Sequence, residues 1–297
     1  MELQTHSWPA SYGERAQPRK GFFTDTSICI GCKACEVACK EWNQIPMSIK
    51  GFSGKSYDNT LALGADTWRH VAFVEQKVPA DAAEGASLVD VAARGEALDA
   101  GLHTYQEGDG IRWLMASDVC KHCTDAACLE VCPTGALFRT EFGTVVVQPD
   151  ICNGCGYCIS ACPFGVINRR EGDGRAWKCT LCYDRLRDDK TPACAQACPT
   201  HSIQFGELDE LREHAQQRVS ALREAGQTKA QLYLADEDNG VGGAGAFFLL
   251  LDDPEVYGLP PDPVDTTREL GEIWSAAGVA AVGLAVGLVV TVFWGRR

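Results

Sequence analysis

The chain has no excess of basic residues. Among its 297 residues, 27 Lys and Arg are outnumbered by 40 Asp and Glu, which gives a formal net charge of −13 at pH 7. Proteins that bind a phosphate backbone rely on basic patches, so this composition argues against a nucleic-acid partner. The glycine-rich stretch at 239–245 is not followed by Gly-Lys-Ser/Thr, which excludes a phosphate-binding loop there.

The features of a secretory signal and of a catalytic site are also missing. The segment from Met1 to Lys20 is polar with scattered aromatic residues. It lacks the basic, apolar and small-residue regions of a signal peptide, so we expect any export to use another route. Ser, His and Asp occur without a motif that groups them, and the 6 histidines are scattered. We therefore expect no catalytic residue in this chain.

No cysteine lies outside four groups of four, and this pattern is the strongest signal in the sequence. In order, the 16 cysteines are Cys29, Cys32, Cys35 and Cys39; Cys120, Cys123, Cys128 and Cys132; Cys152, Cys155, Cys158 and Cys162; and Cys179, Cys182, Cys194 and Cys198. The first and third groups contain Cys-x2-Cys-x2-Cys, a spacing that packs three thiols too closely for ordinary disulfide geometry. We therefore set disulfides aside.

Zinc and iron-sulfur clusters remain as explanations of the cysteine groups. Cys-x2-Cys pairs separated by a longer gap are typical of zinc sites, and the group that begins at Cys179 would fit a zinc ribbon by itself. The set as a whole does not, because the last three groups all end in Cys-x3-Cys-Pro. The stretch from Cys120 to Pro163 instead has the spacing of a bacterial ferredoxin with two 4Fe-4S clusters.

The ferredoxin spacing predicts which cysteines hold each cluster. In two-cluster ferredoxins, the last cysteine of each run ligates the other cluster. The two inner clusters are therefore expected on Cys120, Cys123, Cys128 and Cys162, and on Cys152, Cys155, Cys158 and Cys132. The first and fourth groups resemble the halves of a second ferredoxin with the first one inserted between them. The same rule then predicts two outer clusters, on Cys29, Cys32, Cys35 and Cys198, and on Cys179, Cys182, Cys194 and Cys39.

A long apolar run near the C-terminus predicts a transmembrane helix. Residues 273–294 contain no charged side chain and would span about 33 Å as a helix, against a hydrocarbon core of about 30 Å. Trp274 and Trp294 are placed for the two membrane interfaces. Arg296 and Arg297 follow the run, so the positive-inside rule puts the C-terminus in the cytoplasm and the cluster domain on the outer, periplasmic-side face of the cell membrane.

The remaining sequence predicts short elements around the cysteine runs. Residues 1–27 are expected to be an irregular arm, because proline and glycine break every periodic run. Helices are expected at 36–42 and at 207–225, where five apolar positions share one face and Gly226 ends the helix. Hairpins are expected for 136–139 against 144–147 and around the turn at 172–174. Strands are expected at 68–78, 202–205, 231–234 and 246–251, a helix or a mobile insertion at 80–101, and a stiff proline connector at 260–263.

Together these features predict an α+β fold of two nested bacterial ferredoxin-like units plus one C-terminal transmembrane helix. The outer unit would comprise 1–117, with an insertion at 46–112, and 169–206. The inner unit would comprise 118–168. A packing segment and linker would follow at 207–271, and the membrane helix at 272–295. Four 4Fe-4S clusters are the expected cofactors, and a lipid bilayer is an expected partner.

Several residues near the cysteines are candidates for a supporting role. Gly31 is expected to let the backbone approach a cluster, to serve as an ordinary turn glycine, or to do both. His122, between Cys120 and Cys123, is expected to lie behind the ligands or to face solvent rather than to tune a cluster or carry protons. Basic residues near the runs either offset cluster charge, which would raise reduction potentials, or are ordinary surface residues: Lys33, Lys40, Lys121, Lys178 and Arg185.

From about Gly21 to the C-terminus, the sequence resembles the iron-sulfur (beta) subunit of respiratory, membrane-bound formate dehydrogenase. The resemblance is carried by CIGCKACEVACKEWN, YDN at Tyr57–Asn59, CGYCISACPF, KCTLCYDR, PAC at Pro192–Cys194 and VYGLP before the final helix. Residues 79–110 do not match the pattern of that family. The four-run frame is shared by a wider group, whereas the membrane helix, YDN and KCTLC favour the formate branch.

The resemblance implies an electron-transfer subunit without catalysis of its own. It implies a catalytic partner with a molybdenum or tungsten pterin that oxidises formate, and a membrane cytochrome b partner that passes electrons to quinone. It also implies an outer cluster pair toward the catalytic subunit and an inner pair toward the membrane. The alternatives are the equivalent subunit of a dimethyl sulfoxide, polysulfide, thiosulfate or nitrate reductase, and a zinc-stabilised, membrane-tethered interaction module. Nitrate-type subunits usually replace one cysteine with tryptophan, whereas all 16 positions are cysteine here.

Overall fold

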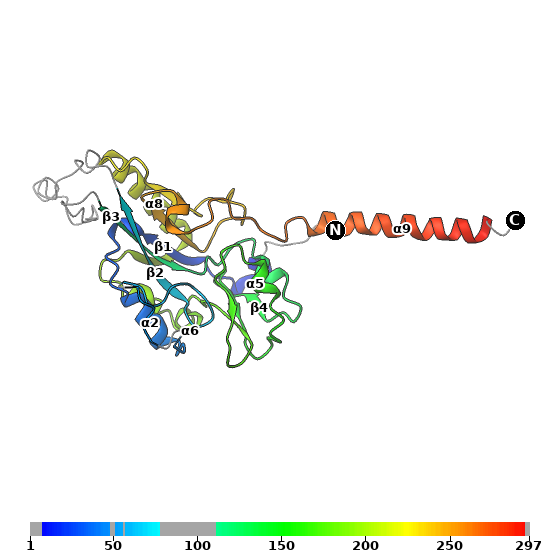
Figure 1. The fold of residues 1–297 in the computed structure, drawn as a ribbon, viewed down its shortest axis with the longest axis horizontal. Coiled ribbons are helices and arrows are strands. Elements are labelled where there is room, and N and C mark those ends of the chain that lie inside the picture. Colours follow the sequence, from blue (N-terminus) through cyan, green and yellow to red (C-terminus); the bar gives the residue numbers. More distant parts are fainter. Residues whose placement is uncertain (1–7, 48–50, 56, 78–110, 295–297) are drawn as a thin grey trace, which may run out of the picture.

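A computed structural model describes residues 8–47, 51–55, 57–77 and 111–294 of the chain. The described part forms a mixed helix and strand body from which one long helix projects (Figure 1). The body carries the cysteine groups, and the projecting helix lies at the C-terminal end of the chain. This arrangement agrees with the predicted α+β class and the predicted C-terminal helix.

A four-stranded sheet forms the centre of the body, in the order β8-β1-β10-β9. Its strands are β8 (Ile203–Glu207), β1 (Lys20–Asp25), β10 (Ala246–Leu250) and β9 (Gln231–Tyr233). β1 pairs in parallel with β10 and antiparallel with β8, whereas β9 is antiparallel to β10. All five residues of β10 are buried, as expected of an apolar strand covered on both faces. The strands predicted at 202–205, 231–234 and 246–251 are confirmed.

The prediction of an irregular arm over residues 1–27 is wrong. The chain there forms α1 (Trp8–Tyr12), η1 (Gly13–Arg15), β1 and η2 (Thr26–Ile28), and residues 1–7 lie outside the described part. β1 joins the two halves of the central sheet, and its residues from Gly21 to Asp25 are all buried. A strand buried on both faces shows no alternation of polar and apolar residues, so periodicity could not reveal it.

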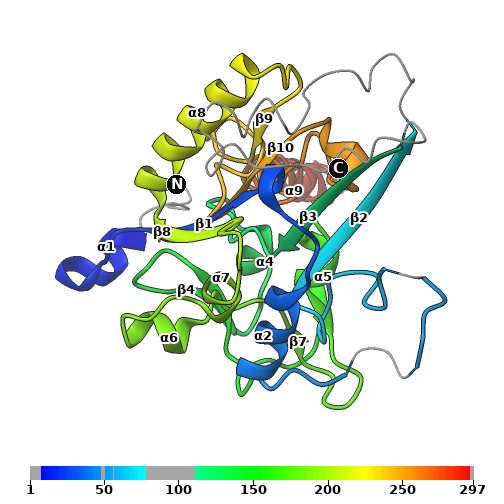
Figure 2. The same cartoon turned by 90° about the vertical axis from the view of Figure 1, so that its left-hand side faces the viewer.

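Helix α8 (Leu208–Glu224) packs along the central sheet, as Figures 1 and 2 show. Its predicted apolar face is confirmed, because the buried residues of the helix are Leu208, Leu211, Ala215, Val219 and Leu222. Gly226 follows the helix with a φ of +93°, a conformation that glycine adopts without steric cost. The helix therefore begins and ends where the sequence predicts, and it serves to cover the core.

A long two-stranded ribbon stands beside the sheet. β2 (Arg69–Lys77) pairs antiparallel with β3 (Ile111–Val119) over nine residue pairs. The strand predicted at 68–78 is thus confirmed. The helix or mobile insertion predicted at 80–101 lies outside the described residues.

Short helices and hairpins surround the cysteine runs. The predicted hairpins are confirmed as β4 (Leu137–Arg139) against β5 (Val145–Val147), and β6 (Asn168–Arg169) against β7 (Ala176–Trp177). The helix predicted at 36–42 is confirmed as α2 (Ala34–Trp42). The other short helices are α4 (Ala127–Glu130), α5 (Tyr157–Ala161), α6 (Tyr183–Arg187), α7 (Ala193–Gln196) and η4 (Pro254–Tyr257).

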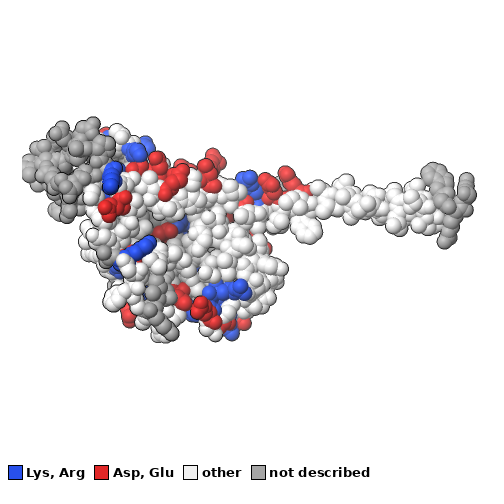
Figure 3. Space-filling view, viewed as in Figure 1, with Lys and Arg blue, Asp and Glu red and all other residues white. Residues whose placement is uncertain are grey.

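Helix α9 (Leu270–Trp294) makes no buried contact with the body. It is long and apolar enough to cross a membrane, with a mean hydropathy of 2.4 and 0% of its apolar window buried. Figure 3 shows the described part of the helix free of charged side chains along its apolar length, whereas acidic and basic residues lie on the body. The linker that precedes it is fixed to the body, because Thr266 Oγ1 donates to the Ala161 carbonyl at 3.1 Å and Thr267 Oγ1 contacts the Glu130 carboxylate.

Replacing Phe23 with alanine is expected to destabilise the body by about 3–5 kcal/mol, the usual loss for truncating a buried phenylalanine. Phe23 is fully buried and its ring stacks on Phe247 with ring centroids 5.2 Å apart. The measurement is the free energy of unfolding, or the shift in the temperature at which the protein loses its structure. Phe52→Ala is the matched control, because Phe52 is fully exposed. Equal stability of the two variants would contradict the central position of β1.

Candidate iron-sulfur centres

The first three cysteines of the sequence lie close to the last one in the folded protein. Cys29 and Cys32 lie between η2 and α2, Cys35 lies in the first turn of α2, and Cys198 follows α7. All four nevertheless line one small pocket. Cys32 is exposed, whereas Cys35 is buried. The contact depends on the central sheet, because β1 leads into the first run and pairs with β8, which follows Cys198. The structure thus brings together the set of four predicted for one outer cluster.

Cys39 lies among the cysteines of the fourth group. Burial raises the pKa of its thiol well above the usual value, and the neighbouring charges of Cys179, Cys194 and Cys182 raise it further. Helix α2, which carries Cys39, packs against α7, which carries Cys194. Asn43 Nδ2 lies 3.7 Å from Cys39 Sγ and 3.9 Å from Cys182 Sγ, so one amide contacts thiols from both runs.

The inner cysteines form two further neighbourhoods. Burial raises the pKa of Cys123 strongly, and so do the adjacent thiols of Cys120, Cys128 and Cys162. Burial also raises the pKa of Cys158 to about 11, with contributions from three other thiols: Cys152, Cys155 and Cys132. In each neighbourhood the fourth member comes from the other run. These groupings are the ones that the ferredoxin spacing predicts for the two inner clusters.

The thiols of neighbouring groups act on one another electrostatically, which indicates that the groups lie in a row. Burial raises the pKa of Cys35 to about 12, and the charge of Cys194 contributes to the increase. After burial, Cys120 makes the largest contribution to the raised pKa of Cys179. Cys158 likewise acts on Cys128. The group of Cys29 therefore adjoins that of Cys39, the group of Cys39 adjoins that of Cys123, and the group of Cys123 adjoins that of Cys158.

The donor set fits iron-sulfur clusters. All 16 cysteines are free, and bunched, buried thiols hold their protons unless a metal supplies compensating charge. A single zinc ion would draw four sulfurs to about 2.3 Å from one point. Within residues 8–47, 51–55, 57–77 and 111–294, no three His, Cys, Asp or Glu side chains are placed to hold one metal ion. A cubane differs from zinc in that each thiolate binds its own iron, so wider thiol spacing suits it.

Backbone amides donate to several of these sulfurs. The amide of Leu181 lies 3.3 Å from Cys179 Sγ, and the amide of Ala176 lies 3.4 Å from Cys152 Sγ. At Cys132, burial raises the thiol pKa, but amide hydrogen bonds led by that from Leu137 outweigh it and lower the pKa. Hydrogen bonds of this kind stabilise thiolate charge and are one of the factors that set cluster potentials.

Among the five predicted basic residues, Lys178 is the one that contacts a cysteine sulfur. Its Nζ lies 3.5 Å from Cys120 Sγ, and its side chain is buried. The other four bind elsewhere: Lys33 pairs with Glu36 and Asp58, and Lys121 pairs with Asp118. Lys40 donates to main-chain carbonyls, and Arg185 donates to Gln196 and to the Thr191 carbonyl. These contacts hold the loops around the runs, and the charge of Lys121 also acts on Cys123, whose pKa it lowers against the larger effect of burial.

His122 does not face solvent, so that alternative is wrong. The residue is buried, and its Nδ1 accepts a hydrogen bond from the Val145 amide at 3.2 Å. Burial lowers its pKa well below the usual value, and the charges of Lys178, Arg139 and Arg19 lower it further. The ring is therefore neutral, with its proton on Nε2. Nε2 is buried and has no hydrogen-bond partner within the described part of the chain.

The close contacts of Gly31 are with the ribbon. Gly31 has a φ of +65°, and a Cβ at this position would lie 2.7 Å from Met115 Sδ and 2.7 Å from a ring carbon of Phe73. Both the turn conformation and the close packing on β2 and β3 favour glycine. The turn conformation and this packing together explain the glycine at position 31.

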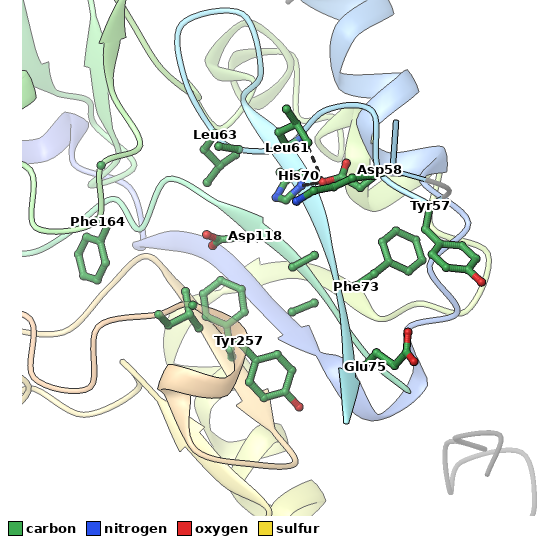
Figure 4. Close-up of a pocket in the computed structure, with 18 of the residues that line it drawn as sticks. Tyr57, Asp58, Leu61, Leu63, His70, Phe73, Glu75, Asp118, Phe164 and Tyr257 are labelled. Carbon is green, nitrogen blue, oxygen red and sulfur yellow. Dashed lines mark hydrogen bonds and ion pairs between the residues drawn. The ribbon is translucent and has the colours of Figure 1, made fainter. Parts of the chain in front are cut away.

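A cavity of about 620 Å³ lies along the ribbon, bordered by η4 and the loop of Phe164. Figure 4 shows Asp58 and His70 facing each other in it, and Tyr57 beside Phe73. His70 Nε2 is 2.9 Å from Asp58 Oδ2, and Asp118 is paired with Lys121. Two of the acidic groups in the lining are thus engaged with basic neighbours, and no cysteine lines this cavity. The cavity is separate from the cysteine groups.

Replacing Asp58 with asparagine is expected to cost about 1–3 kcal/mol at pH 7, the range for leaving the partners of a partly buried hydrogen-bond network unsatisfied. Burial alone raises the pKa of Asp58, but hydrogen bonds from Lys33 and His70 outweigh it and hold that pKa well below its usual range. A carboxyl group with a depressed pKa stabilises the fold above its unfolded pKa of about 3.9, and this contribution is lost as pH falls further. The stability gap between the wild type and Asp58→Asn should therefore be present at pH 7 and shrink as pH falls below about pH 4.

Unfolding measured from pH 7 to pH 3 tests this prediction. Asp188→Asn serves as the control, because Asp188 pairs with Lys190 on the surface, where both side chains are more than half exposed. A gap that did not shrink between pH 4 and pH 3 would contradict the assignment of the charged carboxylate to the folded state.

Comparisons with known proteins show which families this sequence is similar to. A family model described as "4Fe-4S dicluster domain" matches residues 111–208, which contain the last three groups. The formate dehydrogenase iron-sulfur subunit of Haemophilus influenzae is 38% identical over 269 residues, covering 88% of this chain and 76% of that protein. The nitrate-inducible formate dehydrogenase iron-sulfur subunit of Escherichia coli is 38% identical over 272 residues, covering 89% and 81%. One polypeptide of the anaerobic dimethyl sulfoxide reductase of Escherichia coli is 34% identical over 193 residues, covering 65% and 76%.

Proposed function

Because this protein belongs to the family of formate dehydrogenase iron-sulfur subunits, we propose that it relays electrons from a formate-oxidising catalytic subunit to a membrane partner. The chain carries 4Fe-4S clusters, which supply one-electron carriers without an open coordination site. The observation that supports the relay best is the row of four adjacent cysteine groups. The catalytic partner would hold a molybdenum or tungsten pterin, and the membrane partner would be a cytochrome b that reduces quinone.

The ligands in this proposal are the 16 cysteines in interleaved sets. The outer clusters would be held by Cys29, Cys32, Cys35 and Cys198, and by Cys179, Cys182, Cys194 and Cys39. The inner clusters would be held by Cys120, Cys123, Cys128 and Cys162, and by Cys152, Cys155, Cys158 and Cys132. The shared pocket of Cys29, Cys32, Cys35 and Cys198 supports the first set. In this proposal the inner unit spans 118–168 and the outer unit flanks it.

Exposed apolar side chains support an electron entry at the first cysteine group. Cys32 is exposed, and large apolar residues are exposed nearby in the sequence: Ile30, Val37, Trp42, Met47, Tyr57 and Leu61. Large exposed apolar residues that gather in one region are typical of protein interfaces. We propose that the catalytic subunit binds this region.

The opposite end of the row lies near the membrane linker. Cys155 is exposed, and Ile151 and Tyr157 beside it are exposed as well. Helix α5, in the same run, accepts the hydrogen bond from Thr266 that fixes the linker of α9. Electrons leaving at this end would do so close to the bilayer, which supports a membrane cytochrome as the acceptor.

The sidedness of the membrane helix is part of the proposal. Arg296 and Arg297 follow α9, and the positive-inside rule places such residues in the cytoplasm. The cluster body would then lie on the outer face, exported in folded form with a partner that carries a twin-arginine signal. A reporter that is active only in the cytoplasm should therefore be active when it is fused after Arg297. Activity of an external reporter at the same position would reverse the orientation.

The proposal as a whole is tested by identifying the electron donor that the complex uses. The complex is extracted from membranes and given formate, hydrogen or a sulfur compound as electron donor, with a quinone as acceptor. We expect formate to support quinone reduction and the large co-purifying subunit to contain molybdenum or tungsten. Activity with dimethyl sulfoxide as terminal acceptor and none with formate would instead assign the protein to the reductase branch.

A further inference from the structure

We propose that two buried cations, Arg69 and Lys178, bridge consecutive clusters and raise the reduction potentials of the clusters on both sides. The inference rests on the proposed cluster ligands. Arg69 lies between the group of Cys29 and the group of Cys39, and Lys178 lies between the group of Cys39 and the group of Cys123. Each is a positioning residue that acts through charge and hydrogen bonds.

Arg69 contacts a sulfur of one outer group and is linked to the other outer group by Ser117. Its Nη2 lies 3.4 Å from Cys194 Sγ, and its Nη1 donates to the Ser117 hydroxyl at 3.3 Å and to the Ser117 carbonyl at 3.1 Å. The same hydroxyl lies 3.2 Å from Cys35 Sγ. Arg69 therefore reaches one outer group directly and the other through Ser117.

Lys178 occupies the equivalent place at the next junction. Its Nζ lies 3.5 Å from Cys120 Sγ and donates to the carbonyl of Cys179 at 3.0 Å and to that of Val145. Cys120 and Cys179 belong to adjoining groups. The lysine thus touches the last outer group and the first inner group at once.

Both cations lack the usual acidic partner. Arg69 and Lys178 are only 2% and 1% exposed, and within the described ranges neither forms an ion pair with a carboxylate: their polar contacts are sulfur, hydroxyl and carbonyl groups. Burying an unpaired cation is costly, so negative charge must come from elsewhere. Clusters held by four thiolates supply it. Lys121 shows the contrast, because it is equally buried but is paired with Asp118.

A nearby positive charge favours the reduced, more negative state of a cluster and so raises its potential. A cation between two clusters acts on both of them. Arg69 and Lys178 should share one target, the cluster of Cys39, Cys179, Cys182 and Cys194, because this cluster adjoins both junctions. The two residues therefore act on three clusters in total and leave the cluster of Cys158 nearly unaffected.

Redox titration of the membrane-extracted complex, followed by electron paramagnetic resonance, tests the proposal. Four one-electron components are fitted in the wild type, in Arg69→Gln and in Lys178→Gln. We expect each variant to move two components to lower potential, with one component common to both. At a fixed ambient potential, the ratio of oxidised to reduced cluster should rise about tenfold for each affected component, which corresponds to about 59 mV for one electron.

Three further variants separate charge from structure. Arg69→Lys keeps the charge and should restore much of the wild-type potential. Ser117→Ala removes the link to Cys35 and should shift one component rather than two, which also tests the proposal if Arg69→Gln does not assemble. Lys190→Gln removes an exposed, carboxylate-paired cation and should shift none.

Unchanged potentials in Arg69→Gln and Lys178→Gln, or equal shifts of all four components, would overturn the inference. The inference would also be overturned if each variant shifted two components but the two variants had no shifted component in common. A wild-type complex without four iron-sulfur components would instead contradict the proposed function, so the two failures are distinguishable.

Discussion

Replacing Cys179 with alanine is expected to stop quinone reduction by the complex while formate oxidation with an artificial acceptor continues. Cys179 is buried, and its thiol lies beside Cys182 and Cys194 in one group and Cys120 in the next. Alanine supplies no ligand, so the second cluster of the row would be lost or altered. Because the four groups form a single row, no parallel route exists among the described cysteines. Quinone reduction should then fall to the level of a complex that lacks this subunit.

The comparison of two acceptors makes this result specific. A small dye that accepts electrons at the catalytic subunit bypasses the row, so its reduction reports whether that subunit is intact. Thr180→Ala is the matched control, because it changes the neighbouring residue in the same loop without removing a thiol. Quinone reduction by Cys179→Ala at the wild-type rate would show that electrons do not pass through this group.

Removing residues 270–297 is expected to release the cluster body from the membrane. Helix α9 has 25 residues and makes no buried contact with the body, so its removal should leave the fold intact. A spanning helix anchors a protein in an effectively irreversible way. The truncated protein should therefore appear in the soluble fraction after carbonate extraction of membranes, if no other subunit retains it.

A charge within the helix provides a milder version of the same test. Leu284 lies near the middle of α9 and is exposed, and an arginine at the centre of a spanning helix costs about 2.5–3.5 kcal/mol. Leu284→Arg should reduce membrane retention, whereas Leu284→Ile should not. Full retention of the truncated protein when it is expressed by itself would contradict an anchoring role for α9.

The local features of this fold could be predicted from the sequence. The hairpins at β4–β5 and β6–β7 follow from short apolar segments around glycine-containing turns. Helix α8 follows from one apolar stripe that ends at Gly226. The type of cofactor follows from the spacing of the cysteines, because three thiols on one tight loop serve few other purposes. The family was indicated by further motifs, among them YDN and KCTLC, together with the membrane helix.

The long-range features could not be predicted in the same way. β1 pairs in parallel with β10, and the register joins Phe23 to Phe247 across more than two hundred residues. A short buried strand carries no periodic signal that would indicate such a partner. The assignment of residues 1–27 to an irregular arm failed for this reason. The insertion at 80–101 stays a prediction.

The contacts of the residues around the cysteines also depend on long-range packing and could not be predicted from the sequence. Lys178 was a candidate because it stands next to Cys179 in the sequence. Arg69 stands at the start of a strand far from any cysteine, so only the three-dimensional packing of β2 reveals its contact with Cys194. His122 stands between two cysteines, yet its burial and its hydrogen bond from Val145 depend on the hairpin that folds over it.

The most direct test of the central claim is the metal and sulfide content of the purified complex, combined with electron paramagnetic resonance before and after formate is added. The expected result is iron and acid-labile sulfide in the amounts for four cubane clusters in each copy of this subunit, with signals of reduced clusters that appear on addition of formate. Zinc in place of iron, or clusters that formate fails to reduce while another donor reduces them, would contradict the account.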